Sequence, residues 1–140
     1  MKIKLYTVGK PKFNDIFDEF LKRLKKYNKT EHHIIKNPKK EIKKISEETK
    51  NFLKILLDER GKELTSQEFA NFLEKKENQS QNLAFFVGDF FGHSEEIKNI
   101  GEYKISLSKL TLPHDFAMII LVETLYRSFS ILHNHPYHKD

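Results

Sequence analysis

The stretch Leu83-Ala84-Phe85-Phe86-Val87-Gly88 decides the fold class of this 140-residue chain. It is a short, unbroken apolar run that ends at a glycine, a pattern typical of a strand buried on both faces of a sheet. Such strands occur in parallel sheets whose two faces are covered by helices. We therefore expect strands and helices to alternate on either side of it.

The flanking sequence meets this expectation. Short β-prone runs alternate with segments of helical periodicity, and the order predicts one α/β domain over residues 1–140, with a mainly parallel sheet and helices on both faces. A turn is expected at Glu59-Arg60-Gly61, and a capping box at Thr65. The other predicted strands are Ile3–Val8, His32–Ile35, Leu53–Asp58 and Tyr103–Leu107; helices are expected at Phe13–Tyr27, at 39–50, after Thr65, after Ser94 and at Asp115–Leu132.

The composition narrows the chemistry. The chain has no cysteine, which excludes disulfides, thiolate metal sites and cysteine nucleophiles. Residues 1–50 hold 15 basic and 7 acidic side chains, a net charge of +8, whereas four of the seven histidines lie at or after His114. No apolar run approaches the ~20 residues of a membrane span, and no signal peptide is evident. We expect a cytoplasmic protein with no membrane or metal partner.

Ligands of parallel sheets bind beyond the carboxyl ends of the strands, where three segments are predicted to meet: 57–62, 88–92 and 108–114. The last of these belongs to Leu107-Ser108-Lys109-Leu110-Thr111-Leu112-Pro113-His114, which leaves a strand without becoming polar. Two interpretations remain open for this apolar loop. It walls a pocket and offers backbone groups to an adenine edge, or it is covered by another protein chain.

The last helix and the tail carry the remaining candidates. Glu123 and Arg127 are spaced i, i+4 on an apolar helix, which suits either a structural ion pair or an active-site arginine. The tail, which includes Tyr137 and His138, is either a frayed end or a segment that folds over a pocket and supplies hydrogen-bonding or acid–base groups.

The loop Leu107–His114, the helix segment Val122–Arg127 and the tail Asn134–His138 together resemble the SPOUT-class ribosomal RNA large subunit methyltransferase H family. The resemblance covers essentially the whole chain. It implies an enzyme that uses S-adenosyl-L-methionine to methylate N3 of a pseudouridine in 23S ribosomal RNA, with the assembled ribosome as the expected context. It also implies a C-terminal trefoil knot and a homodimer.

The resemblance also implies roles for particular residues. Glu123 and Arg127 would lie at the dimer interface, and Tyr137 and His138 near the partner subunit's cofactor. Arg127 is expected to stabilise negative charge or grip phosphate, Glu123 to hold Arg127, and Tyr137 or His138 to handle the proton or orient the base. Cofactor contacts are expected at Leu57, Gly88, Leu107, Ser108, Lys109, Leu110, Thr111 and Leu112.

The absence of cysteine supports this chemistry independently, because methylation of C5 of a pyrimidine generally needs a covalent nucleophile. Transfer to nitrogen or oxygen is therefore favoured. An alternative is a non-catalytic RNA- or ribosome-binding homodimer of the same fold that has lost cofactor binding through Asp89-Phe90-Phe91. A metal-dependent enzyme using the histidine-rich tail is a weaker third hypothesis, since no acidic cluster has ligand spacing.

Overall fold

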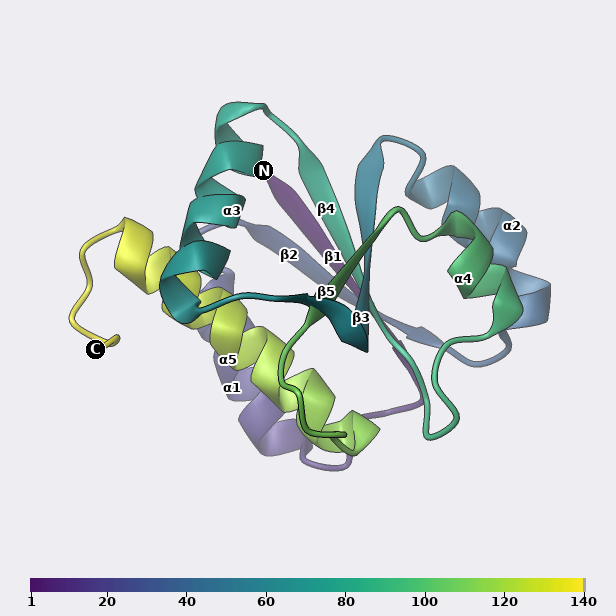
Figure 1. Ribbon diagram of the computed structural model, residues 1–140. Helices are drawn as coiled ribbons and strands as arrows, with labels where there is room; N and C mark the ends of the chain where they lie inside the picture. Colours follow the sequence, from purple (N-terminus) through teal and green to yellow (C-terminus); the bar gives the residue numbers. More distant parts are fainter. Residues whose placement is uncertain (140) are drawn as a thin grey trace.

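The computed structural model describes residues 1–139 and alternates five strands with five helices over that range (Figure 1). Each predicted element is present. The strands are β1 (Lys2–Val8), β2 (Lys29–Ile35), β3 (Phe52–Glu63), β4 (Asn82–Val87) and β5 (Tyr103–Ser106); the helices are α1 (Asn14–Leu24), α2 (Pro38–Glu48), α3 (Ser66–Asn78), α4 (Glu95–Ile100) and α5 (His114–Leu132).

The strands form one parallel sheet in the order β2-β1-β4-β3-β5. The apolar run that decided the fold class is β4, and it lies at the centre of the sheet. Its residues 83–87 are all at least nine-tenths buried. The predicted parallel α/β architecture is confirmed.

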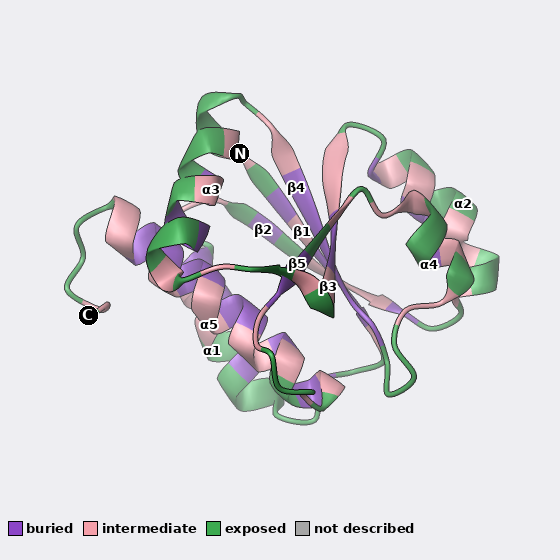
Figure 2. Cartoon of the chain, in the orientation of Figure 1, coloured by how far each residue is buried: buried purple, intermediate pink, exposed green. Residues whose placement is uncertain are grey.

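Helices cover both faces of the sheet (Figures 1 and 2). Alternate residues of β4 point to opposite faces, as the pleat of a strand requires. Phe85 packs into a core shared with α1, α3 and α5, whereas Phe86 packs into a second core with Ile45 of α2 and Ile97 of α4. In the described part of the chain, no helix is both long and apolar enough to cross a bilayer.

The turn predicted at Glu59-Arg60-Gly61 is wrong, because β3 continues through these residues to Glu63. The pairing with β5 is interrupted rather than ended: Leu57 and Lys62 are both in register with Ile105, so the residues between them bulge outward. A Cβ atom at Gly61 would lie 2.7 Å from the carbonyl carbon of Lys104. Glycine therefore lets β3 run against the backbone of β5 where another residue would stop it.

Candidate functional site

A cavity of about 350 Å³ lies at the carboxyl edge of the sheet. Its walls come from the three segments predicted to meet there, together with the start of α5. The mixed lining combines apolar side chains with hydroxyls, carboxylates and histidines, which is typical of a small-molecule site. The lining residues are Leu57–Arg60, Val87–His93, Lys98, Leu107, Ser108, Leu110–Leu112, His114 and Ala117.

The predicted cofactor contacts map onto this cavity with one exception. Leu57, Gly88, Leu107, Ser108, Leu110, Thr111 and Leu112 all line it, whereas Lys109 does not. The loop forms part of a pocket wall, as the first interpretation has it, while Leu110 is 74% exposed, which leaves the second interpretation, a covering protein chain, open. The loop walls the cavity with one side and leaves the other side uncovered.

The loop after β5 is held in place by hydroxyl groups. The Ser106 hydroxyl donates to the Ser108 carbonyl at 2.8 Å, and the Ser108 hydroxyl accepts from the Leu110 amide at 3.0 Å. Thr111 Oγ1 donates to Glu59 Oε2 at 2.6 Å, which connects the loop to the bulge of β3. Two walls of the cavity are thus linked directly.

The turn after β4 forms the third wall. The Asp89 carbonyl accepts from the Gly92 amide at 2.9 Å, and the Asp89 carboxylate accepts from the Phe91 amide at 2.8 Å. Asp at the first and Gly at the fourth position suit such a turn. A Cβ atom at Gly88 would lie 2.6 Å from the Gly92 carbonyl carbon, so this wall is built on a backbone approach that only glycine permits.

His93 is a part of the cavity that sequence reasoning missed. Its Nε2 atom lies 2.8 Å from the Leu57 carbonyl oxygen, and since that oxygen only accepts, Nε2 carries the proton. Burial lowers the pKa of His93 below its ordinary value. A neutral histidine thus connects the turn after β4 to β3. Its position directly after Gly92, beyond a buried strand, was the available signal.

The four predicted catalytic residues also come together, near the other end of α5. Glu123 Oε1 accepts from Arg127 Nε at 3.0 Å, from Arg127 Nη2 at 2.6 Å and from the Tyr137 hydroxyl at 2.9 Å. The Arg127 guanidinium carbon lies 4.9 Å from the centre of the Tyr137 ring. Arg127 Nη1 lies 2.9 Å from His138 Nδ1. The tail therefore folds back onto α5, and we refer to these four residues as the arginine cluster.

The geometry fixes protonation states in the arginine cluster. Arginine has only donors, so His138 Nδ1 accepts the bond from Arg127. Burial, and then the hydrogen bond to Glu123, raise the pKa of Tyr137, so its phenol stays protonated. The hydrogen bond to Glu123 raises the pKa of Arg127, which stays charged. The cluster presents a fixed cation, flanked by donors.

The cavity and the arginine cluster are separate within one chain. Ala117 on α5 lines the cavity, and Arg127 lies ten residues further along the same helix. An α-helix rises 1.5 Å per residue, so the two positions are about 15 Å apart along its axis. One chain alone does not bring its own Arg127 to its own cavity.

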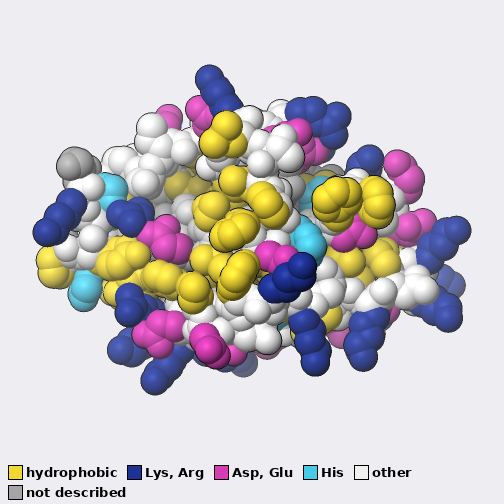
Figure 3. Space-filling view, turned by 90° about the horizontal axis from the view of Figure 1, so that it is seen from below, with side chains coloured by type: hydrophobic (Ala, Val, Ile, Leu, Met, Phe, Trp, Pro, Cys, Tyr) yellow, Lys and Arg dark blue, Asp and Glu magenta, His cyan; other side chains and the backbone are white. Residues whose placement is uncertain are grey.

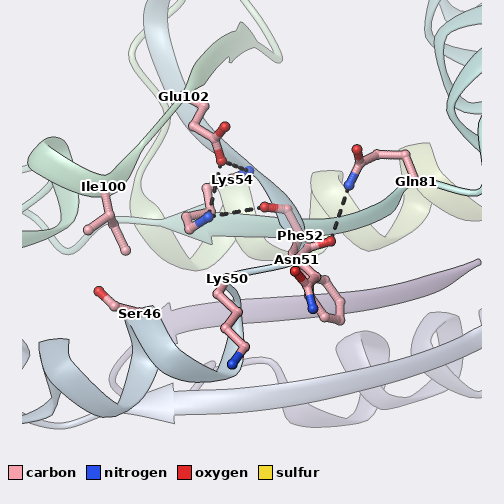
Figure 4. A pocket seen from close by; sticks show the side chains of 8 residues that line it. All are labelled: Ser46, Lys50, Asn51, Phe52, Lys54, Gln81, Ile100 and Glu102. Carbon is pink, nitrogen blue, oxygen red and sulfur yellow. Dashed lines mark hydrogen bonds and ion pairs between the residues drawn. The ribbon is translucent and has the colours of Figure 1, made fainter.

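A second, more open hollow lies at the opposite edge of the sheet, near the start of β3 (Figure 4). Its most buried cation is already paired: Lys54 Nζ donates to Glu102 Oε1 and to the Phe52 carbonyl, both at 3.1 Å. We assign no chemistry to this hollow. Among residues 1–139, no group of three or more histidine and carboxylate side chains is arranged to hold a metal ion.

Comparison with known proteins identifies the family of this chain. A family model described as "Predicted SPOUT methyltransferase" matches residues 1–138. Two proteins called ribosomal RNA large subunit methyltransferase H are similar over nearly their full lengths: one from Maridesulfovibrio salexigens is 36% identical, covering 98% of this chain and 97% of its own, and one from Parabacteroides distasonis is 37% identical, covering all of both.

A solved structure shares the fold. The SpoU methyltransferase AviRb from Streptomyces viridochromogenes, solved in complex with the cofactor AdoMet, has a TM-score of 0.54 at 11% identity and covers 96% of this chain and 61% of its own. The likeness is one of fold alone, whereas the family model and the two relatives match the sequence from end to end. This chain therefore belongs to the SPOUT methyltransferase family.

Proposed function

We propose that this protein transfers a methyl group from S-adenosyl-L-methionine to N3 of a pseudouridine in 23S ribosomal RNA. The observation that carries the proposal is the cavity at the carboxyl edge of the sheet, which combines seven of the eight predicted cofactor contacts. The names of the full-length relatives support a large-subunit ribosomal RNA as the substrate.

The lining suits the cofactor. The cavity volume lies within the range of small-molecule sites, roughly 300–1,000 Å³. Leu57, Leu107 and Leu112 offer an apolar slot for a purine, and Asp58 and Glu59 offer carboxylates to ribose hydroxyls or to a cationic group. When bound, S-adenosyl-L-methionine supplies an electrophilic methyl group on a positively charged sulfur atom.

The acceptor chemistry follows from what the chain contains. Without cysteine, the chain has no thiol with which to activate C5 of a pyrimidine, so an imide nitrogen is the simpler acceptor. The N3–H bond would have to break first, with its proton passing to solvent, and the nitrogen lone pair would then form the new N–C bond as the C–S bond breaks and its electron pair stays on sulfur. The chain must therefore stabilise an imide anion in line with the methyl group.

The arginine cluster suits this task. Arg127 provides the fixed positive charge, and Glu123 and Tyr137 hold its orientation. His138, whose Nδ1 atom accepts from Arg127, would orient the base beside this cation. Tyr137 keeps its own proton and is not poised to remove that of N3, which would leave to water as Arg127 stabilises the anion that forms.

Because the cavity and the arginine cluster are separate in one chain, we propose a homodimer in which each cluster completes the partner's cavity. Apolar side chains exposed at the start of α1 and of α5 support this assembly. Phe13 and Phe116 are 41% and 49% exposed, and their rings contact each other at 5.3 Å. We propose that the partner also covers Leu110, on the uncovered side of the loop after β5.

We also propose that the chain after β5 is threaded as a trefoil knot. Membership in the SPOUT family supports this proposal, and so does the tight packing of β3 against β5, where an added Cβ atom at Gly61 would lie 2.7 Å from the Lys104 carbonyl carbon. An experimental chain trace through residues 57–113 tests the threading.

The decisive test maps methylated nucleotides in 23S ribosomal RNA from a strain that lacks this gene. We expect the loss of one N3-methylpseudouridine, restored by the wild-type gene and not by an Arg127→Ala variant. An unchanged methylation map would overturn the substrate. Calorimetric titration of the protein with S-adenosyl-L-methionine distinguishes the methyltransferase from the non-catalytic RNA- or ribosome-binding homodimer. Absence of binding would favour the non-catalytic homodimer.

A further inference from the structure

Two phenylalanines stand out at the rim of the cavity. The side chains of Phe90 and Phe91 are 81% and 89% exposed, the highest fractions among the large apolar side chains in the described part of the chain. Their rings pack edge to face, with 5.2 Å between centroids and 86° between planes. Exposed aromatic pairs of this kind indicate a binding surface rather than a core.

The turn that carries these rings is pre-organised. Asp89 is bonded to Gly92 through both backbone groups and to the Phe91 amide through its carboxylate. Gly92 has φ of +88°, a conformation that favours glycine, and Gly88 packs against the backbone of Gly92. The rings therefore do not need to be ordered by a ligand, which lowers the entropic cost of binding.

The surroundings favour RNA. The parallel topology brings Lys10 and Lys12, which follow β1, and Lys36, which follows β2, to the same edge of the sheet as this turn. In Figure 3, which views the molecule from below, Lys and Arg side chains stand around much of the rim of the face, with apolar side chains between them. Phosphates suit the cations, and an unpaired base suits an open aromatic face.

The size of the aromatic pair argues against a protein partner. Two phenylalanine side chains supply at most about 500 Å² of apolar surface, below the ~800 Å² that each partner contributes to a stable protein interface. The pair is also distinct from the apolar contact between Phe13 and Phe116 that we assign to the dimer. A single stacked base needs only one ring face.

We propose that Phe90 and Phe91 form a stacking platform for an unpaired base that flanks the target nucleotide. The inference rests on the proposed function, since it assumes that an RNA base enters the adjacent cavity. The platform would hold the flanking base at the rim and so position the target base beside the methyl group. The two rings would act on RNA affinity, and because they also line the cavity, the affinity for S-adenosyl-L-methionine is measured as a separate quantity.

The test compares three double variants, in each of which Phe90 and Phe91 are both replaced by alanine, by leucine or by tyrosine. Kd for large ribosomal subunits from the deletion strain is measured by filter binding, KM by methyl transfer, and Kd for S-adenosyl-L-methionine by calorimetry. We expect the alanine and leucine pairs to weaken RNA binding about tenfold, and the tyrosine pair to bind like wild type. Leucine keeps the apolar surface and removes only the ring.

The outcomes are distinguishable. The stacking platform would be overturned if the leucine pair binds subunits like wild type. It would also be overturned if the alanine pair leaves both the Kd for subunits and the KM for methyl transfer unchanged. An alanine pair that changes only the sedimentation behaviour would overturn it in favour of a protein contact. If the wild type binds subunits but transfers no methyl group, the proposed function fails, while the filter-binding comparison still decides whether the rings hold RNA.

Discussion

Arg127 is held by a single carboxylate oxygen of Glu123, which accepts hydrogen bonds from both Nε and Nη2 of the guanidinium. The same oxygen accepts the Tyr137 hydroxyl, so one atom fixes the helix and the tail together. The three hydrogen bonds to this oxygen restrict the side chains of Arg127 and Tyr137, which is useful where a cation must be placed accurately.

Replacement of Arg127 or Glu123 tests this placement. We expect Arg127→Ala to lower kcat about a hundredfold or more, because a preorganised charge is lost. Glu123→Gln leaves the cation present but poorly oriented, and we expect a loss of roughly tenfold or more. Single-turnover methyl transfer on ribosomes measures both. Glu47→Gln, which removes the partner of Lys50 in an exposed ion pair on the far side of the molecule, is the control and should leave the rate unchanged.

Mixed dimers test whether the arginine cluster acts on the partner's cavity. Gly88→Ala, which disturbs the cavity, and Arg127→Ala, which disturbs the cluster, should each be inactive alone. Random mixing should then restore about a quarter of the wild-type activity, because half of the dimers are mixed and each contains one intact site. Activity that stays absent after verified subunit exchange would refute the shared site.

Gly88→Ala alone tests the close packing of the turn after β4. The added methyl group would meet the Gly92 carbonyl carbon at 2.6 Å, so the turn must shift. We expect the free energy of unfolding to fall by about 1–3 kcal/mol and the affinity for S-adenosyl-L-methionine to decrease. Gly9→Asn is the control, since Gly9 has φ of +80° with open space around it and Asn tolerates that conformation. Equal cofactor affinity in both variants would contradict the steric argument.

His93 gives the fold a defined response to acid. Burial lowers its pKa, with Lys98 and Lys104 acting in the same direction, whereas the Leu57 carbonyl and Asp58 oppose the shift. The unfolded chain therefore binds a proton at this site before the folded chain does. The contribution of His93 to the free energy of unfolding is therefore complete above its pKa in the unfolded chain, about 6.5. This contribution is lost as pH falls toward its lower pKa in the folded chain.

Urea unfolding at roughly pH 7 and pH 5 measures this effect. His93→Gln, which keeps a donor for the Leu57 carbonyl but does not titrate, should lose less stability on acidification than the wild type. Burial also lowers the pKa of His32, so part of the acid response should persist in the variant. A variant with the full wild-type acid response would show that His93 does not contribute.

Thr65→Ala tests the capping box of α3. The Thr65 hydroxyl accepts from the Glu68 amide at 3.1 Å, and the Glu68 carboxylate accepts from the Thr65 amide at 2.9 Å. Removal of the hydroxyl should lower the free energy of unfolding by about 1 kcal/mol, measured by thermal or urea denaturation. Cofactor affinity should not change, because the cap is not part of the cavity lining. Ser66→Ala, one residue further along, is the matched control.

The sequence predicted the elements of the fold well where local patterns decide them. The apolar run at β4, the helical spacing of α1 and the capping box at Thr65 each specify an element by their own periodicity or hydrogen bonding. The bulge at Asp58–Gly61 was mistaken for a turn, because Gly61 signals a chain reversal as readily as a close crossing. Only its approach to Lys104 distinguishes the two, and that contact is not local.

In the candidate site too, the sequence predicted a local contact and missed contacts between distant segments. The i, i+4 spacing of Glu123 and Arg127 predicted their ion pair directly. The return of Tyr137 and His138 onto α5 was not predicted, because it depends on contacts that spacing does not encode; the residues suggested a frayed end or a segment over a pocket, and the resemblance implied only a place near the partner subunit's cofactor. His93 was missed because its bond to Leu57 joins two segments 36 residues apart.

The position of β4 has a consequence for the order in which this chain acquires its structure. Its partners β1 and β3 are synthesised first. β1 can pair with β2 once residues 29–35 emerge, but β3 cannot be joined to them until residues 82–87 emerge. For more than half of its synthesis the nascent chain therefore lacks the central strand that unites the sheet. Non-local parallel pairing of this kind slows folding and leaves strand edges open to aggregation, so the window before β4 appears is where a chaperone would matter most.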